Sequence, residues 1–216
     1  MPARADYDRK TIYAILDEAL VAHVGFAADG QPYVIPTLHA RVDDNVYFHG
    51  SSASRTVRAL AEGAPVCLTV TLLDGLVLAR SAVHHSVNYR SVLVFGQATP
   101  IEADAEKMAA IETFTERLIP GRWSEVRPPT AKELKAIQVF ALPLDEASAK
   151  IRSGPPVDDE EDYALDTWAG VIPLATVAGT PTPDRRLADA SAPSPAARDW
   201  VERRRPPAEH TGPGPS

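Results

Sequence analysis

Side chains suited to holding an anion gather between Val46 and Leu60. Three β-favouring residues lead to Gly50, a run of small hydroxyl residues follows, and Arg55 and Arg58 then fall on the expected first turns of a helix. Serine and threonine hydroxyls, backbone N–H groups at a helix start and a guanidinium are the donors that a phosphomonoester needs. The same residues also fit an ordinary helix capped by Ser54 with solvated arginines, so two interpretations are open.

A second dense group of polar side chains runs from Arg80 to Ser91. Its histidines, His84 and His85, are adjacent, so on a strand their rings would point to opposite faces. No further histidine, cysteine or carboxylate stands at a usual ligand spacing from them, and we expect no metal site. Neither a nucleophile elbow around Ser86 nor a glycine-rich nucleotide loop is present. A bound phosphate would therefore be held by side chains and a turn.

Charge and cysteine content exclude several classes of protein. The 216 residues carry a formal net charge of −7, which argues against a nucleic-acid partner bound through counterion release. One cysteine, Cys67, leaves no disulfide framework and indicates a reducing compartment. No signal peptide and no apolar run of membrane-spanning length is present, so we expect a cytoplasmic protein without a membrane partner.

The elements that must position these groups read as an antiparallel meander with a few helices. Helical spacing predicts helices over 8–22, 54–62 and 104–118, and strand patterns predict strands over 23–28, 33–42, 46–49, 65–72, 75–81, 89–98 and 136–143. Strands at intervals of about ten residues favour a small closed or partly closed barrel. Residues 154–162 form an acidic loop that is too polar for a core, and Trp168 follows it. We assign residues 1–178 to one domain and 179–216 to a disordered tail rich in proline, alanine and arginine, in which residues 198–205 could form one or two helical turns.

The order of these motifs resembles a known family. Tyr47–Gly50 leading into Ser54–Thr56, with Asp74–Ser81, His84–Val92 and Gly96, is similar to the pyridoxamine 5′-phosphate oxidase-related proteins. The resemblance covers about residues 8 to 175. Within this family, the sequence is most similar to the nitroimidazole-resistance branch, also called flavin-nucleotide-binding proteins. It implies a mainly β fold with flanking helices, an antiparallel split β-barrel, and a homodimer with flavin mononucleotide (FMN) in a cleft between subunits.

The resemblance also implies roles for individual residues. The segment Ser54, Arg55 and Thr56 would grip the FMN phosphate, with His49 and Ser51 beside it. Arg80 and Ser81 would lie near the flavin ring or ribityl chain. The side of the flavin that is open to substrate would be lined by His84, His85 and Tyr89. Trp168, in a signature running to Leu174, would pack near the ring, from the partner subunit.

Departures from the family pattern shape the expected activity. True pyridoxamine phosphate oxidases carry an Arg-x-Val-Leu-Leu-Lys strand before the phosphate turn, and a Trp-Arg pair with a further arginine near the C-terminus. Here the strand from Ile35 to Arg41 reads Ile-Pro-Thr-Leu-His-Ala-Arg, and the C-terminus is rich in proline. We therefore expect an FMN-dependent oxidoreductase acting on a small organic acceptor, such as a nitro compound or a quinone. Two alternatives stay open. One is a reductase that uses the deazaflavin F420, and the other is a non-catalytic flavin- or haem-binding protein in which His49, His84 or His85 is the axial haem ligand.

Overall fold

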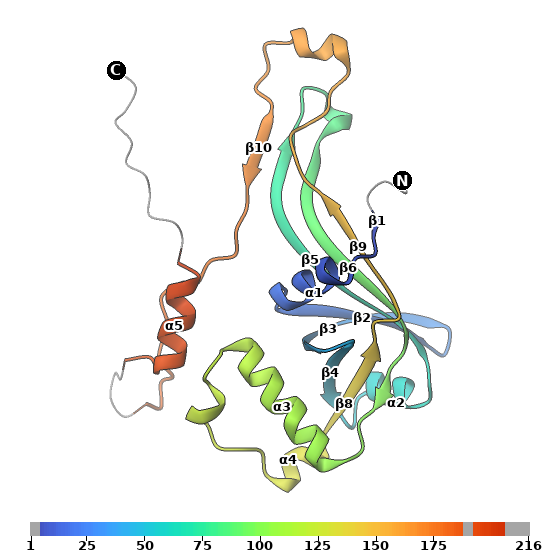
Figure 1. The fold of residues 1–216 in the computed structure, drawn as a ribbon, viewed down its shortest axis with the longest axis vertical. Helices are drawn as coiled ribbons and strands as arrows, with labels where there is room; N and C mark the ends of the chain where they lie inside the picture. Colours follow the sequence, from blue (N-terminus) through green and yellow to red (C-terminus); the bar gives the residue numbers. More distant parts are fainter. Residues whose placement is uncertain (1–4, 188–191, 206–216) are drawn as a thin grey trace.

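The computed structural model describes residues 5–187 and 192–205 (Figure 1). Its strands are β1 (Ala5–Asp6), β2 (Val21–Ala28), β3 (Gln31–Val42), β4 (Asn45–Ser51), β5 (Pro65–Leu78), β6 (Ser86–Gln97), β7 (Thr99–Pro100), β8 (Ile137–Pro143), β9 (Glu146–Arg152) and β10 (Gly170–Pro173). Its α-helices are α1 (Arg9–Glu18), α2 (Arg55–Ala61), α3 (Asp104–Leu118), α4 (Ala131–Ala136) and α5 (Pro195–Arg203), and short 3₁₀ helices are η2 (Ala82–His84), η3 (Trp123–Glu125) and η4 (Glu160–Ala164). None of the helices within these described ranges is long and apolar enough to cross a membrane.

The strands form one antiparallel sheet whose order is β1-β9-β6-β5-β2-β3-β4-β8-β7, with β10 paired to β5. Consecutive strands β2, β3 and β4 are joined by tight turns, of which Asp29–Gly30 is the hairpin turn expected from the sequence. The mainly antiparallel β fold with flanking helices is therefore confirmed.

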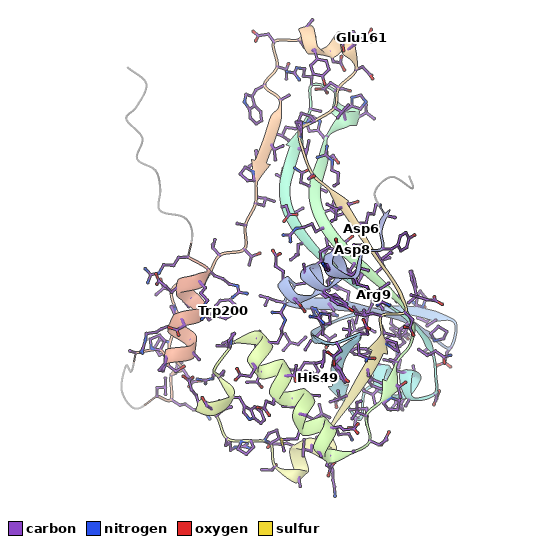
Figure 2. The ribbon with its side chains drawn as sticks, in the orientation of Figure 1. Asp6, Asp8, Arg9, His49, Glu161 and Trp200 are labelled. Atoms are coloured by element: carbon purple, nitrogen blue, oxygen red, sulfur yellow. The ribbon has the colours of Figure 1, made fainter. Side chains whose placement is uncertain are left out.

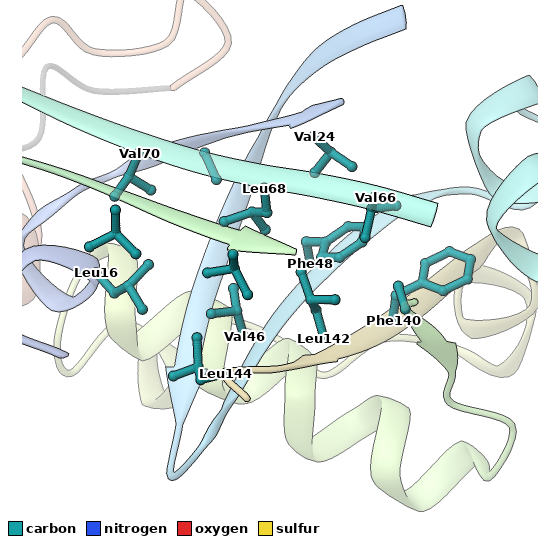
Figure 3. Close-up of a cluster of buried hydrophobic side chains, with 14 of the residues drawn as sticks. Leu16, Val24, Val46, Phe48, Val66, Leu68, Val70, Phe140, Leu142 and Leu144 are labelled. Carbon is teal, nitrogen blue, oxygen red and sulfur yellow. The ribbon is translucent and has the colours of Figure 1, made fainter. Parts of the chain in front are cut away.

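The core lies between the curved sheet and helix α1 (Figure 3). Helix α1 begins at its cap Asp8, whose carboxylate accepts the Thr11 N–H, and it buries Ile12, Ile15 and Leu16. Alternate residues of the strands face the same core: Val24 from β2, Val46, Phe48, Leu68, Val70 and Leu142 among others. This packing fixes β4, and with it the chain that leads into α2.

An arm made by the far ends of β5 and β6 projects from the barrel, with η4 at its tip (Figure 1). The sequence predicted two strands separated by an Asp74–Gly75 turn, and this is wrong, because β5 runs without a break from Pro65 to Leu78. Asp74 instead lies at a bulge opposite β6. A Cβ at Gly75 would lie 3.0 Å from the Ile172 carbonyl oxygen, so glycine lets β10 pair closely with β5.

Other elements were missed or differ. Strands β9 and β10 and helix α4 were not expected, and β9 completes the pairing of β6. Within the segment expected to be a disordered tail, Pro195–Arg203 forms helix α5, capped by Ser194, which overlaps the short helix left open for residues 198–205. The N–H of Ala196 donates to a Glu125 side-chain oxygen at 3.1 Å, which docks α5 on η3. The expected disorder of residues 188–191 and 206–216 lies outside the described residues.

Candidate functional site

The turn between β4 and α2 caps the helix and also places polar side chains at the edge of a pocket. The Ser54 hydroxyl oxygen accepts the Val57 N–H at 3.2 Å, as the sequence indicated for a cap. That hydroxyl still has its own proton to donate to an anion. Gly50 matters here, since a Cβ there would lie 3.1 Å from a Val57 methyl and would push α2 away from β4.

A pocket of about 240 Å³, which we call the β4 pocket, opens beside this turn. Its lining is Val24, Ile35, Pro36, Thr37, Phe48, His49, Gly50, Ser51, Ser54, Thr56, Val57 and Phe140. Four of the predicted cofactor-binding residues, His49, Ser51, Ser54 and Thr56, thus lie together on one pocket. The wall opposite them is mostly apolar, so the pocket combines hydroxyl donors with a surface suited to a flat ring.

A second, more apolar pocket of about 310 Å³ lies against α3, and we call it the α3 pocket. It is lined by Leu38, His49, Ile111, Phe114, Thr115, Leu118, Ile119, Arg122 and Ile137. The apolar helix face predicted for residues 104–118 therefore exists, but several of its members face this pocket. Of the lining residues, His49 alone belongs to both pockets.

His49, labelled near α3 in Figure 2, lines both pockets and so can interact with a group in either. Its ring lies against Phe114 with 5.1 Å between ring centroids. Its Nδ1 is buried and has no hydrogen-bond partner among the described residues. Burial lowers the pKa of this imidazole, so the neutral form is favoured. A neutral imidazole with an uncommitted nitrogen is the form that binds metals and accepts protons.

Arg55 does not line the β4 pocket. Its guanidinium lies over the Tyr33 ring, 5.0 Å from the ring centroid, and donates to the Tyr33 hydroxyl. It lines a third pocket, the α2 pocket, of about 470 Å³, together with Arg58 and Glu62. The predicted phosphate segment therefore faces two pockets on opposite sides of α2.

The remaining predicted site residues lie on the arm, and none of them lines the β4 pocket. Arg80 and Ser81 follow β5, His84 ends η2, His85 comes next, Tyr89 is on β6, and Trp168 precedes β10. Trp168 is 66% exposed. The structure of one chain thus divides the predicted site into a barrel part and an arm part.

Asp158 organises the arm part. Its carboxylate accepts the Arg80 N–H at 2.9 Å, an Arg80 guanidinium N–H at 3.1 Å and the Ser81 N–H at 3.4 Å. Burial opposes ionisation of this carboxyl, but these hydrogen bonds outweigh it and hold its pKa below the usual value. The acidic loop was expected to be too polar for burial, and for Asp158, which is 7% exposed, this is wrong. No sequence signal marks this residue among its acidic neighbours.

His84 also meets carboxylates at the tip of the arm. One donor atom each from His84, Asp159 and Asp162 lie within 4.8 Å of one another. The sequence argument considered only the histidines and their local spacing, so it could not see carboxylates brought in by η4. Asp159 is exposed, and such a group is also an ordinary solvated surface.

Arg90, which belongs to the polar stretch from Arg80 to Ser91, forms ion pairs that stabilise the fold. Its guanidinium bonds to Asp74 at 2.8 Å and to Glu18, the last residue of α1. These bonds join the base of the arm to the barrel. Residues that the sequence argument missed at the pockets include Thr37, Phe114 and Arg122. Only the helical spacing around Phe114 carried a signal, because the other two become neighbours through folding alone.

Comparisons with known proteins agree with this architecture. The family model described as pyridoxamine 5′-phosphate oxidase matches residues 8–151. The chain is similar to the flavocytochrome Anf3 from Azotobacter vinelandii, with 46% identity, a TM-score of 0.84, and coverage of 94% of this chain and 92% of that one. It is also similar to an FAD and heme binding protein from Mycobacterium smegmatis, with 40% identity, a TM-score of 0.86, and coverage of 91% and 96%.

A putative 5-nitroimidazole antibiotic resistance protein from Bacteroides thetaiotaomicron shares the fold at 22% identity. Its TM-score is 0.59, and the match covers 68% of this chain and 86% of that one. No curated protein matches the chain. The family match and these structures confirm the expected split β-barrel.

Proposed function

Since this chain belongs to the pyridoxamine 5′-phosphate oxidase family, we propose that it is a redox protein that binds a flavin and a haem side by side. The observation that carries this proposal is His49, the one lining residue common to the β4 pocket and the α3 pocket. The expectation from sequence treated flavin and haem as alternatives. Two similar proteins are described as a flavocytochrome and as an FAD and heme binding protein, which supports the presence of both.

The β4 pocket fits the flavin. Its apolar wall, including Ile35 and Pro36, offers a surface for the ring system, and the hydroxyls of Ser51, Ser54 and Thr56 offer donors for the phosphate end. Ser54 binds its own helix through one lone pair and keeps its proton for a ligand.

The α3 pocket fits the haem. Its lining is largely aliphatic and aromatic, and it includes the imidazole of His49, whose neutral form is favoured by burial. Imidazole is the commonest axial ligand of protein haem. Arg122, at the same pocket, donates to Glu125 at 2.8 Å and to the Ser194 hydroxyl at 3.1 Å, and is the cation placed to pair with a haem carboxylate.

Together the two groups supply one- and two-electron chemistry when bound, and the protein sets their spacing and surroundings. His49 contributes by lying between the two pockets, and Phe114 holds its ring in place. A small organic acceptor, of the nitro or quinone class, is the proposed destination of the electrons. Reduced nicotinamide oxidation followed with and without such acceptors is the assay for this finer point.

We propose that the working form is a homodimer. The β4 pocket, at about 240 Å³, is smaller than the roughly 300–1,000 Å³ of most cofactor sites, so a second subunit would complete it. Large apolar side chains are exposed on the strands next to it and on the arm: Val34, Ile35, Leu73, Leu76, Trp168, Ile172 and Leu174. In such a dimer the partner's arm would bring its own Arg80, Ser81 and Tyr89 toward this pocket, in addition to the Trp168 for which the family resemblance implies such a placement.

The test is the absorption spectrum of the protein reconstituted with haem and flavin. His49→Ala should lose most of the haem Soret band while keeping flavin absorbance. His23→Ala, on an exposed position of β2, is the matched control and should keep both. Loss of haem in His84→Ala or His85→Ala instead of His49→Ala would place the haem on the arm. A wild-type protein that takes up flavin but no haem would contradict the proposal of two cofactors.

A further inference from the structure

We propose that the α2 pocket binds the adenosine monophosphate half of flavin adenine dinucleotide (FAD), and that Arg58 selects FAD over FMN. This inference rests on the proposed function, because it needs the flavin ring in the neighbouring β4 pocket. FMN ends at one phosphate, whereas FAD continues through a second phosphate into adenosine. Residues beyond the first phosphate are therefore contacted by FAD alone.

Helix geometry places the two pockets on opposite faces of α2. Arg55, Arg58, Ala59 and Glu62 line the α2 pocket, and their spacing of three, four and seven residues puts them on one helix face. Thr56 and Val57 line the β4 pocket on another face, next to the cap residue Ser54. A dinucleotide whose phosphates pass the Ser54–Arg55 turn would reach both pockets.

The opposite wall of the α2 pocket is made of small residues. Ala27 and Ala28 end β2, Gly63 and Ala64 lead into β5, and their short side chains leave the volume of about 470 Å³. This is the size range of sites for small organic ligands. Arg55, at the edge of this pocket, lies over the ring of Tyr33, which stacks with Phe26.

The cations of this pocket have few competing partners. Among the described residues, neither Arg55 nor Arg58 has a carboxylate oxygen within the 4.0 Å of an ion pair, although the chain is acidic overall. The one hydrogen bond of the Arg58 guanidinium within the described part of the chain goes to the Ala53 carbonyl oxygen, at 3.3 Å. Asp29 and Glu62 also line the pocket, so its charge is mixed. Their presence gives a second test, because removing a negative charge should favour a bound phosphate.

The experiment titrates the flavin-free full chain with FAD and with FMN, following quenching of flavin fluorescence. Arg58→Ala should weaken FAD binding by roughly 5- to 10-fold, between the effect of an exposed ion pair and that of a charge-assisted hydrogen bond. FMN binding should change by less than about twofold, since FMN has no group in the α2 pocket. Glu62→Gln should shift FAD binding in the opposite direction. The control Arg127→Ala removes an exposed arginine that pairs with Glu133 away from this pocket.

Each outcome separates this inference from the proposed function. Equal weakening of FAD and FMN by Arg58→Ala would place Arg58 on the shared phosphate and overturn the inference. No effect on either flavin would overturn it as well, as would a wild-type protein that binds FMN as tightly as FAD. A wild-type protein that binds neither flavin would instead defeat the proposed function.

Discussion

At the scale of residues, two histidines whose pKa is lowered by burial have different partners. Burial lowers the pKa of both His39 and His49. His39 donates from Nε2 to the Leu16 carbonyl oxygen at 3.0 Å, because a carbonyl can only accept, so its role is to bind the end of α1. His49 has no such backbone partner at Nδ1 and faces two pockets. Nδ1 has no hydrogen-bond partner among the described residues in either ring, so the Nε2 bond of His39 and the greater exposure of His49 separate the structural histidine from the candidate ligand.

His39 should make the fold sensitive to acid. Its folded-state pKa lies below the unfolded value near 6.5, chiefly through burial, with the Leu16 hydrogen bond opposing and the nearby Arg117 charge assisting. Below about pH 6.5 the unfolded chain binds a proton that the folded chain resists, so stability falls as pH falls toward the folded-state pKa. The slope due to one such group is at most about 1.4 kcal/mol per pH unit.

Urea unfolding of the wild type and of His39→Gln, from pH 8 to pH 5, measures this effect. Glutamine can donate to the Leu16 carbonyl but does not titrate, so the variant should lose less stability in acid. Other groups, including His49, are present in both proteins, so their contributions to the pH dependence of the unfolding free energy cancel in the comparison. Parallel stability curves for the two proteins would show that His39 does not couple folding to pH.

At the scale of elements, the arm depends on Asp158. This one carboxylate holds the segment before η4 against the ends of β5 and η2 through the Arg80 and Ser81 N–H groups and the Arg80 side chain. The Arg80 guanidinium lies 5.0 Å from the centroid of the Tyr163 ring, which adds a contact between Arg80 and η4 itself. The arm tip is therefore one unit held by a single charged centre.

Asp158→Asn should loosen this tip without unfolding the barrel. The loss of the negative charge leaves Arg80 without its carboxylate, so amide hydrogen exchange at Arg80 and Ser81 should speed up on the order of tenfold. Asp159→Asn, at the exposed neighbour, should leave these amides unchanged. If exchange in the two variants is indistinguishable, Asp158 does not anchor the segment.

At the scale of the whole molecule, the arm separates the predicted site residues of one chain into two groups. Figure 1 shows the ends of β5 and β6 projecting from the barrel. Arg80, Ser81 and Tyr89 belong to this arm and do not line the β4 pocket, and apolar side chains on β5 and β10 are exposed. Solvent exposure of several large apolar residues on neighbouring strands is typical of an interface. An interface with twofold symmetry would use each of these surfaces twice.

Leu76→Glu tests the proposed dimer. Leu76 is exposed on β5, and a glutamate there would enter the interface twice and weaken dimerisation by at least about 2 kcal/mol. Light scattering after size exclusion should show a dimer for the wild type and a concentration-dependent shift to monomer for the variant, with lower flavin occupancy. Val126→Glu, in an exposed loop, is the control. A wild-type monomer with full flavin occupancy would contradict the proposed dimer.

The sequence by itself determined the local elements that carry the site. Period-two and helical patterns, the Asp29–Gly30 turn and the Ser54 cap depend on neighbours within a few residues, and the structure confirms them. The order of motifs also identified the family and its split barrel. The unbroken β5 escaped prediction, because a bulge at Asp74 and the distant pairing of β10 override a local turn signal.

Only the tertiary structure decided which side chains meet. Asp158 reaches Arg80 across 78 positions, and Phe114 reaches His49 from another element. The two faces of α2 became distinct only when β2 and β4 packed on either side of it, which separates Arg58 from Thr56. The physical reason is that local patterns encode the conformation of a segment, whereas pockets arise from the packing of segments whose partners no local pattern specifies.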